Sequence, residues 1–528
     1  MKKFRGGTCN NNKMIYVFTF NISVLVFFLN YCLFCFPLNV SDIWFWASVW
    51  ISGFVGFCLS QIIFTIFGKK FDEYKHLKFG LIYSLGLPII IGIIFLIDLF
   101  CFKSLSRIAP EIEHVSMETM FPVTDTIVND AIVDTTTAEK NANKVLGTLG
   151  TIGSRYVAKE YFVLTVKDSP EAEPKMVRVA PLGYDGFFRY CKYKYDGIPG
   201  YIISTTTETG SARYVELEKP IFYSPSACFS KYLKRHLRFT YPTMLLGEPH
   251  FELDDNGNGF WITPRYKHNV ALAGREVIGT VVTDANTGVS EWYRLGEEPD
   301  WVSCVYAGDY ACDIYSWQGM YFDGLSNALF GKEGCWKTTE IETSDSLDRD
   351  YAYKFKDGQI WSVTGVKTLA TDTKSTIAVL MTSQKTNKAF WCDIAGADEG
   401  SVMTTASEEY HAYEYTASFP SLINIDGELT YVCVVTDKES VVKNWVFINM
   451  KDISRIVTAK SEAEGFAKYR KLLKLGVTDT NEKPSNNEIV EQGETINNID
   501  AVRVYTSNGV TYVEIDKDGQ TEVYQVAQ

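Results

Sequence analysis

Three long apolar segments within the first 102 residues constrain this 528-residue chain more than any other feature. They run from Met14 to Phe36, from Ile43 to Phe67 and from Phe79 to Phe102. Each is long enough to cross a hydrocarbon core roughly 30 Å thick as a helix that rises about 1.5 Å per residue. No further run of membrane length follows. We therefore predict three transmembrane helices followed by a large domain outside the bilayer.

Basic residues indicate how the helices cross the membrane. Four precede the first segment and four more lie between the second and third, whereas the first loop, Pro37 to Asp42, has none. Because loops rich in Lys and Arg stay in the cytoplasm, the N-terminal tail and the second loop are predicted to be cytoplasmic. Three crossings then place the chain from Lys103 onward on the extracytoplasmic side of the cell membrane.

A cleaved signal peptide is the alternative interpretation of the first segment, since signal peptides also place a basic stretch before an apolar core. The core here is too long, and no small-residue cleavage site follows it. The polar residues inside the segments are few. Asp98 lies near the outer end of the third segment, and the amides can bond between helices. Because three helices are few for a transporter, we interpret them as an anchor.

The net charge of the chain limits the classes of molecule that it can bind. Because the whole chain carries −13 and the first 102 residues carry +4, the remainder carries −17. An acidic domain argues against nucleic acid and anionic lipid as main partners. The seven cysteines beyond the anchor fit no disulfide framework, although Cys304 and Cys312 are spaced as a local pair. Without a CxxC pair, the sequence indicates neither structural zinc nor another cofactor.

Beyond the anchor, local patterns predict an α+β fold made mainly of antiparallel β structure. Thr136 and Glu139 form a capping-box spacing before a helix that Gly150 ends. A second helix is predicted over Ser226 to Phe239, and a third over Ser461 to Lys474. Strand pairs with turn residues between them are predicted at Tyr161–Val166 with Lys175–Val179, and within Tyr201–Leu217, His250–Thr263, Gly279–Leu295 and Thr376–Ile394.

Two of these hairpins, YIISTTTETGSARYVEL (Tyr201 to Leu217) and TVVTDANTGVSEWYRL (Thr280 to Leu295), lie behind helices such as TAEKNANKVLGTLG. This order of helix, strand, Thr-Gly turn and aromatic strand resembles PepSY-like units of bacterial envelope proteins. The whole chain also resembles a family of bacterial multi-pass membrane proteins with a large outer domain, a likeness that implies no chemistry. PepSY-like units resemble inhibitory or chaperone-like companions of envelope enzymes, which implies interaction rather than catalysis.

The predicted organisation follows from these elements. It comprises a cytoplasmic tail (1–13), a three-helix anchor (14–102), a stalk (103–130), PepSY-like units 1 (131–222) and 2 (223–300), a third α+β region (301–476), a polar linker (477–498) and a small antiparallel β module (499–528).

A cation site is the first candidate for chemistry. Asp254, Asn256 and Asn258 match the first half of a calcium loop of the form D-x-N-x-N-G. The twelfth position is Arg265, where such loops need a bidentate Glu, and a strand follows where a helix is needed. A turn between two strands explains the same residues.

A basic helix and an aromatic stretch are the candidate binding surfaces. Lys231, Lys234, Arg235 and Arg238 could bind an anionic envelope polymer, and the alternative is a solvated helix face. The aromatic residues between Tyr184 and Tyr201 could form a platform for sugars, although aromatic residues at strand spacing usually fill a core.

No catalytic motif stands out, because HExxH and GxSxG are both missing from the sequence. We therefore expect a membrane-anchored extracytoplasmic binding or scaffold protein whose partner is an envelope protein or polymer. The alternatives are an envelope hydrolase with a dispersed active site and an accessory subunit of a membrane complex. A cleft that brings His250 or His411 to a carboxylate and a nucleophile would favour the hydrolase.

Overall fold

The computed structural model describes residues 5–67, 73–127, 130–158, 160–167, 172–206, 211–270, 272–340, 351–370, 374–474, 501–507, 510–517 and 520–525. The chain forms two compact units, Met1–Arg470 and Lys471–Gln528. The predicted linker 477–498 lies outside the described residues.

Three N-terminal helices confirm the apolar segments. They are α1 (Arg5–Phe34), α2 (Ile43–Ile66) and α3 (Glu73–Phe100), and each contains a stretch long and apolar enough to cross a membrane. α2 begins at Asp42, whose carboxylate accepts a hydrogen bond from the Phe45 amide. Glycines allow the helices to approach closely, since a Cβ on Gly56 would lie 2.1 Å from the hydroxyl oxygen of Ser23 on α1.

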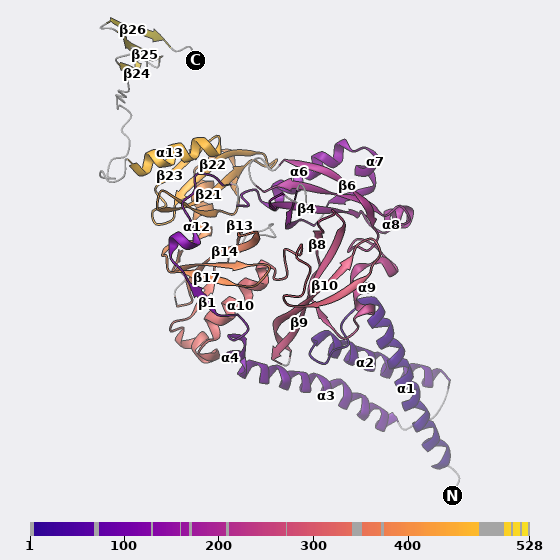
Figure 1. Cartoon of the computed structure of the whole chain (residues 1–528). Helices are drawn as coiled ribbons and strands as arrows, with labels where there is room; N and C mark the ends of the chain where they lie inside the picture. Colours follow the sequence, from indigo (N-terminus) through magenta and orange to yellow (C-terminus); the bar gives the residue numbers. More distant parts are fainter. Residues whose placement is uncertain are drawn as a thin grey trace. The chain divides into compact units, whose positions relative to one another are not determined.

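Among the described residues, the rest of the first unit is built mainly on four sheets whose long strands run antiparallel (Figure 1). Each contains four strands that pair in the order of the chain, and such meanders are also the repeating unit of β-propellers. The meander of sheet 1 is β3 (Phe162–Val166), β4 (Lys175–Tyr184), β5 (Ile198–Thr205) and β6 (Ala212–Ile221), and that of sheet 2 is β8 (His250–Leu253), β9 (Gly259–Val270), β10 (Ala273–Asp284) and β11 (Ser290–Arg294).

Sheets 3 and 4 follow the same plan in the region predicted as one α+β part. The meander of sheet 3 is β13 (Ala352–Lys356), β14 (Gln359–Thr368), β16 (Ala378–Ser383) and β17 (Ala389–Cys392), and that of sheet 4 is β20 (Ser421–Ile425), β21 (Glu428–Thr436), β22 (Val442–Asn449) and β23 (Ile456–Ala459). Short strands extend the four sheets, namely β2 (Tyr156–Ala158), β7 (Leu245–Leu246), β1 (Ile112–His114), β12 (Trp336–Thr338) and β19 (Thr416–Ala417).

The predicted α+β class with mainly antiparallel strands is confirmed. The hairpins at β3–β4, β5–β6, β8–β9, β10–β11 and β16–β17 stand where they were predicted. The PepSY-like units remain a prediction. In the structure, the hairpins of each predicted unit join into a four-stranded meander.

Helix boundaries differ from the sequence prediction in two places. α6 (Thr135–Thr148) begins one residue before the predicted capping Thr136, because the carboxylate of Asp134 accepts the Thr137 amide at 2.7 Å. The helix predicted over Ser226 to Phe239 is only α9 (Leu233–Thr240), preceded by a 3-10 turn at Phe229–Lys231. The remaining long helices are α10 (Gly308–Tyr321), α12 (Glu399–Glu408) and α13 (Glu462–Lys474).

The predicted stalk, 103–130, is instead part of the folded unit. Its strand β1 pairs in parallel with β17, and Met120 and Phe121 are buried in the core shared by sheets 3 and 4. Farther along, the Thr124 amide donates to the Asn424 carbonyl of sheet 4 at 3.0 Å. The segment was predicted as a stalk because it shows no helical or strand period, whereas its order comes from contacts with residues far away in the sequence.

Residues 120–127 and 130–135, which we call the strut, connect three sheets. The buried carboxylate of Asp130 accepts hydrogen bonds from the Lys354 ammonium of sheet 3 and the Ser421 hydroxyl of sheet 4, both at 2.5 Å. Two residues later, the Ile132 amide donates to the Thr206 carbonyl at the end of sheet 1. The strut therefore fixes sheets 1, 3 and 4 against one another.

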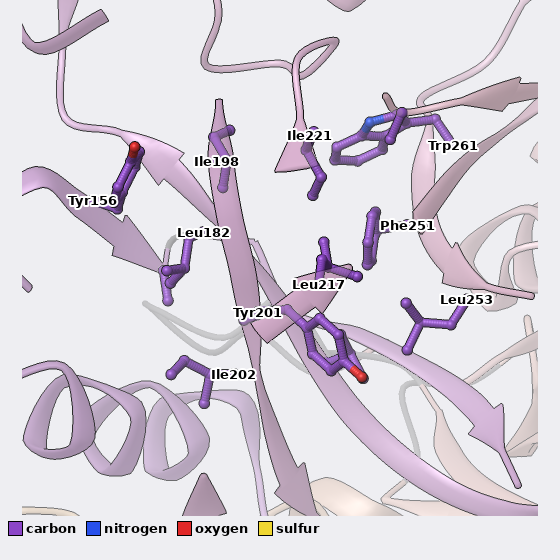
Figure 2. Packing of buried hydrophobic residues seen from close by; sticks show 14 of the residues in the cluster. Tyr156, Leu182, Ile198, Tyr201, Ile202, Leu217, Ile221, Phe251, Leu253 and Trp261 are labelled. Atoms are coloured by element: carbon purple, nitrogen blue, oxygen red, sulfur yellow. The ribbon is translucent and has the colours of Figure 1, made fainter. Parts of the chain in front are cut away.

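Sheets 1 and 2 share the largest hydrophobic core (Figure 2). Ile202 and Tyr201 of β5 pack in one cluster with Phe251 of β8 and Trp261 of β9. The rings of Phe251 and Trp261 meet edge to face with centroids 5.3 Å apart. This core holds the facing edges of the two sheets, on which the candidate site lies.

The second unit contains the predicted small β module. Its strands β24 (Ala501–Ser507), β25 (Val510–Lys517) and β26 (Gln520–Gln525) form an antiparallel sheet with β25 in the middle. The prediction of three short antiparallel strands at this end of the chain is confirmed.

We expect Asp130→Ala to destabilise the first unit strongly. The substitution leaves the largely buried Lys354 ammonium without its carboxylate, and removing one partner of a buried ion pair costs about 3 kcal/mol or more. Thermal unfolding of the purified full chain, followed by tryptophan fluorescence, measures the change.

Glu113→Ala is the matched control for this experiment. It breaks the Lys388–Glu113 pair, whose atoms are 3.0 Å apart but whose side chains are both more than half exposed, so we expect a loss below about 1 kcal/mol. Equal losses for the two variants would contradict a central role of Asp130.

Candidate functional site

Two adjoining cavities lie between sheets 1 and 2, and we call them together the Glu160 groove. Their volumes are about 400 and 370 Å³, and both are lined by Glu160 and Pro225. The larger cavity extends along the end of β4 and the turn before α9, and Trp261 of β9 forms part of its wall. The smaller cavity extends along α9 and the loop before β8. Pockets of this size suit a small ligand or a segment of a polymer.

Two carboxylates stand in the smaller cavity. Glu160 lies on the loop between β2 and β3, and Glu248 lies on the corresponding loop between β7 and β8. Glu160 reaches solvent at the cavity mouth, but the protein atoms around it, and secondly the charge of Glu248, raise the pKa of its carboxyl. The groove therefore contains one carboxyl that is protonated more readily than usual beside a second carboxylate.

Two hydroxyl groups in the same cavity are buried without a hydrogen-bond partner among the described residues. Thr263 of β9 is only 1% exposed, and its hydroxyl oxygen is unpaired. The hydroxyl of Tyr161, beside Glu160, is also unpaired, and burial raises the pKa of this phenol. A buried hydroxyl without a partner costs free energy, and both hydroxyls belong to residues that line this cavity.

The walls around these polar groups are apolar. Leu233 and Leu237 of α9, Leu246 of β7 and Phe162 of β3 line the smaller cavity. Hydroxyls and carboxylates set in apolar walls match an uncharged ligand that carries several hydroxyl groups. Lys234 and Arg238 line the same cavity, so two basic side chains balance the two carboxylates there.

The predicted basic residues of α9 and its preceding turn do not gather on one surface. Arg238 is 6% exposed, and its guanidinium donates to the carbonyls of Cys35 at 3.0 Å and Met244 at 2.7 Å. The Lys231 ammonium lies 3.9 Å from the centre of the Tyr223 ring. Arg235 donates to the Phe229 carbonyl, whereas Lys234 is exposed and lines the smaller cavity. Of the four, Lys234 alone is both exposed and at the groove.

The predicted calcium loop folds as a turn held by its own side chains. One oxygen of Asp254 accepts the amides of Asn256 and Asn258, and the other accepts the Asn258 side-chain amide at 2.9 Å. Across the described ranges, no group of three His, Cys, Asp or Glu side chains is placed to hold a metal ion. Asp254 also lines a third cavity of about 510 Å³, together with Asp300.

His250 lies in a cluster of the kind that would favour the hydrolase, but the cluster is closed. Glu252 is 1% exposed, and its carboxylate accepts hydrogen bonds from the His250 ring at 2.8 Å and from the amides of Ser303 and Cys304. The Cys304 thiol is 7% exposed, and none of the cavities described above is lined by these residues. The cluster therefore fastens residues 303–304 to β8. His411, the other candidate, is exposed on a 3-10 turn.

The groove residues were missed by the sequence analysis because they belong to no local motif. Glu160 and Glu248 are far apart in the sequence and meet only when sheets 1 and 2 pack together. The one signal in the sequence was position, since Glu160 lies one residue before the predicted strand at Tyr161 and Glu248 lies two residues before the strand pair at His250. The aromatic stretch contributes only partly, as Tyr184 and Phe187 line the larger cavity.

Comparisons with known proteins add little. No protein-family model and no curated protein matches the chain. Among solved structures, the crystal structure of a mutant of the B. megaterium levansucrase aligns with 9% sequence identity over 78% of this chain and 95% of that chain, with a TM-score of 0.18. At this TM-score the similarity carries no information about fold or function.

We expect Thr263→Val to stabilise the protein in the absence of ligand. Valine keeps the shape of threonine and removes the buried, unpaired hydroxyl, which should raise the free energy of unfolding by about 1 kcal/mol. Chemical unfolding of the full chain in detergent gives this value.

Thr280→Val is the matched control, because Thr280 is equally buried on the neighbouring strand but its hydroxyl donates to the Thr263 carbonyl at 3.2 Å. We expect it to lower stability by about 1 kcal/mol. A loss of stability in both variants would show that the Thr263 hydroxyl is satisfied in the ligand-free protein.

We also expect stability to fall in alkaline solution because of His250. Burial alone would lower the pKa of its ring, but Cys304 and then Glu252 outweigh this effect and raise the pKa from 6.5 to about 10. A raised pKa means that the stabilisation is complete below about pH 6.5 and is lost as the pH rises through about 10.

The free energy of unfolding measured from pH 6 to pH 10.5 tests this expectation. His250→Gln should flatten the decrease between about pH 6.5 and 10, whereas His411→Gln, at an exposed position, should leave it unchanged. The same pH profile in wild type and His250→Gln would rule out the charged His250 as its source.

Proposed function

We propose that this chain is a membrane-anchored, extracytoplasmic binding or scaffold protein of the cell envelope that holds a saccharide chain in the Glu160 groove. The observation that carries the proposal is the pair of unpaired hydroxyls, Thr263 and Tyr161, in the wall of a cavity that also contains two carboxylates. A sugar offers hydroxyl groups that both donate and accept, which is the chemistry that hydroxyls and carboxylates bond.

The larger cavity supports a polymer rather than a single sugar. It continues from Glu160 towards Phe187, which lies on α8 (Phe187–Tyr193) and is half exposed. Phe187 packs near Phe229 with ring centroids 6.0 Å apart. Exposed aromatic rings beside a groove that contains polar groups can stack on the apolar faces of successive sugar rings.

Contacts between the groove and the N-terminal helices support the proposal that these helices anchor the domain to the membrane. The Tyr31 hydroxyl near the end of α1 donates to the Arg238 carbonyl, and the Arg238 guanidinium donates back to Cys35. α9 thus forms one wall of the groove and also rests on the end of α1. At the end of α3, the Asp98 carboxylate accepts the Leu272 amide at 3.0 Å. The C-terminal ends of α1 and α3 contact the same domain. Three crossings from a cytoplasmic N-terminus would put both of these ends on the extracytoplasmic side.

A glycoside hydrolase is the second candidate, and the raised pKa of Glu160 favours it. Glycoside hydrolysis uses one protonated carboxyl as general acid and a second carboxylate as base or nucleophile. Glu160 and Glu248 fit these two roles in kind, since the pKa of Glu160 is raised and both residues line the smaller cavity.

Binding of defined envelope oligosaccharides to the full chain in lipid nanodiscs tests the proposal. We expect Glu248→Gln to weaken binding about tenfold or more, since a hydrogen bond from a ligand to a charged group contributes roughly 1.5 to 3 kcal/mol. Glu218→Gln, on the exposed side of β6, is the charge-matched control and should bind as wild type does. Equal affinities for all three proteins would contradict a site in the groove.

An assay for new reducing ends separates the two candidates. If the protein only binds, wild type releases none. If it is a hydrolase, wild type releases them and Glu160→Gln loses the activity by about a hundredfold or more.

A further inference from the structure

An exposed apolar turn follows α10. The chain continues through α11 (Gly324–Ser326) into a single π-helical turn, Asn327–Gly331. In this turn Leu329 is 57% exposed and Phe330 is 86% exposed, and Phe322 just before it is 44% exposed. Neighbouring apolar side chains that the fold leaves uncovered mark a surface that contacts something other than water. We call residues 327–331 the apolar tip.

Hydrogen bonds hold the tip in this exposed conformation. The Asn327 side-chain amide donates to the Glu333 carbonyl at 2.9 Å, and its carbonyl oxygen accepts the Glu333 amide at 3.2 Å. The same side chain reaches the thiol of Cys335, which is 1% exposed. These bonds close the loop between Asn327 and Glu333, on which Leu329 and Phe330 lie exposed.

The base of the tip lies at the end of α3. α4 (Phe102–Leu105) follows α3 almost directly, and the Phe102 ring meets the Tyr321 ring edge to face with centroids 4.8 Å apart. The Lys103 ammonium is 3.9 Å from the carboxylate of Asp323. Figure 1 shows α10 beside α4. The tip therefore starts where the third membrane-length helix ends.

We propose that Leu329 and Phe330 insert into the headgroup region of the bilayer that α3 crosses. Interfacial segments bury aromatic and aliphatic side chains roughly 5–10 Å deep at the boundary between headgroups and acyl chains. Lys103 and Arg107, both exposed on the adjoining segment, suit the phosphate groups of the lipids. The domain then rests on the membrane at α9 and at the tip. This inference rests on the proposed membrane location of α3.

Photocrosslinking to lipid tests the proposal. The full chain is prepared with the photoreactive amino acid benzoylphenylalanine in place of Phe330, reconstituted in liposomes of phosphatidylethanolamine and phosphatidylglycerol, and irradiated. Two further preparations carry the probe at Phe188 or at Leu85. Phe188 is also 86% exposed but lies on α8, and Leu85 is 61% exposed within α3. The readout is the mass of lipid attached to the chain.

Lipid adducts at Leu85 and Phe330, on the order of tenfold more abundant than at Phe188, would support insertion of the tip. Adducts at Leu85 without adducts at Phe330 would overturn the proposal and leave the membrane anchor standing. No adducts at Leu85 would overturn the membrane location itself. Equal adducts at Phe330 and Phe188 would also overturn the proposal, because exposure alone would then explain them.

Discussion

The buried carboxylate of Asp130 is the interaction on which the arrangement of the sheets depends. Sheets 1, 3 and 4 have no common strand, and Asp130 accepts hydrogen bonds from Lys354 and Ser421 while the next residues pair with sheets 3 and 1. A buried ion pair with both partners satisfied gives specificity of position more than net stability. The strut thus fixes which edges of the sheets face one another, whereas the hydrophobic cores stabilise the fold.

The position of the Glu160 groove also follows from how two sheets pack together. Sheets 1 and 2 pack through their shared core, which brings the loops that enter β3 and β8 together and places Glu160 near Glu248. The third wall is α9, and Arg238 ties this helix to the end of α1. Hydrogen bonds therefore connect the end of α1 to one wall of the groove.

The parts of the fold that depend on local patterns could be predicted from the sequence. Apolar length revealed α1 to α3, and turn residues such as Asn387, which has a positive φ of 55°, revealed the hairpins. The strut could not be predicted, because its backbone pairs with Asn424 and Thr206, which are distant in the sequence. The pairing of Glu160 with Glu248 could not be predicted either, because these residues are also distant in the sequence. The basic run on α9 was visible, but burial of Arg238 against Cys35 was not.

Thr263 shows how stability and function can be separated in this protein. A fold selected for stability alone would carry valine at a 1% exposed strand position, since a hydroxyl there gains nothing without a partner. Its strand neighbour Thr280 pairs its hydroxyl with the backbone, whereas Thr137 on α6, also 1% exposed, does not. The unpaired hydroxyls of Thr263 and Tyr161 occur in one cavity, beside a carboxyl whose pKa is raised. Polar groups that the fold itself leaves unsatisfied, gathered in one place, are the physical signature of a site that a ligand completes.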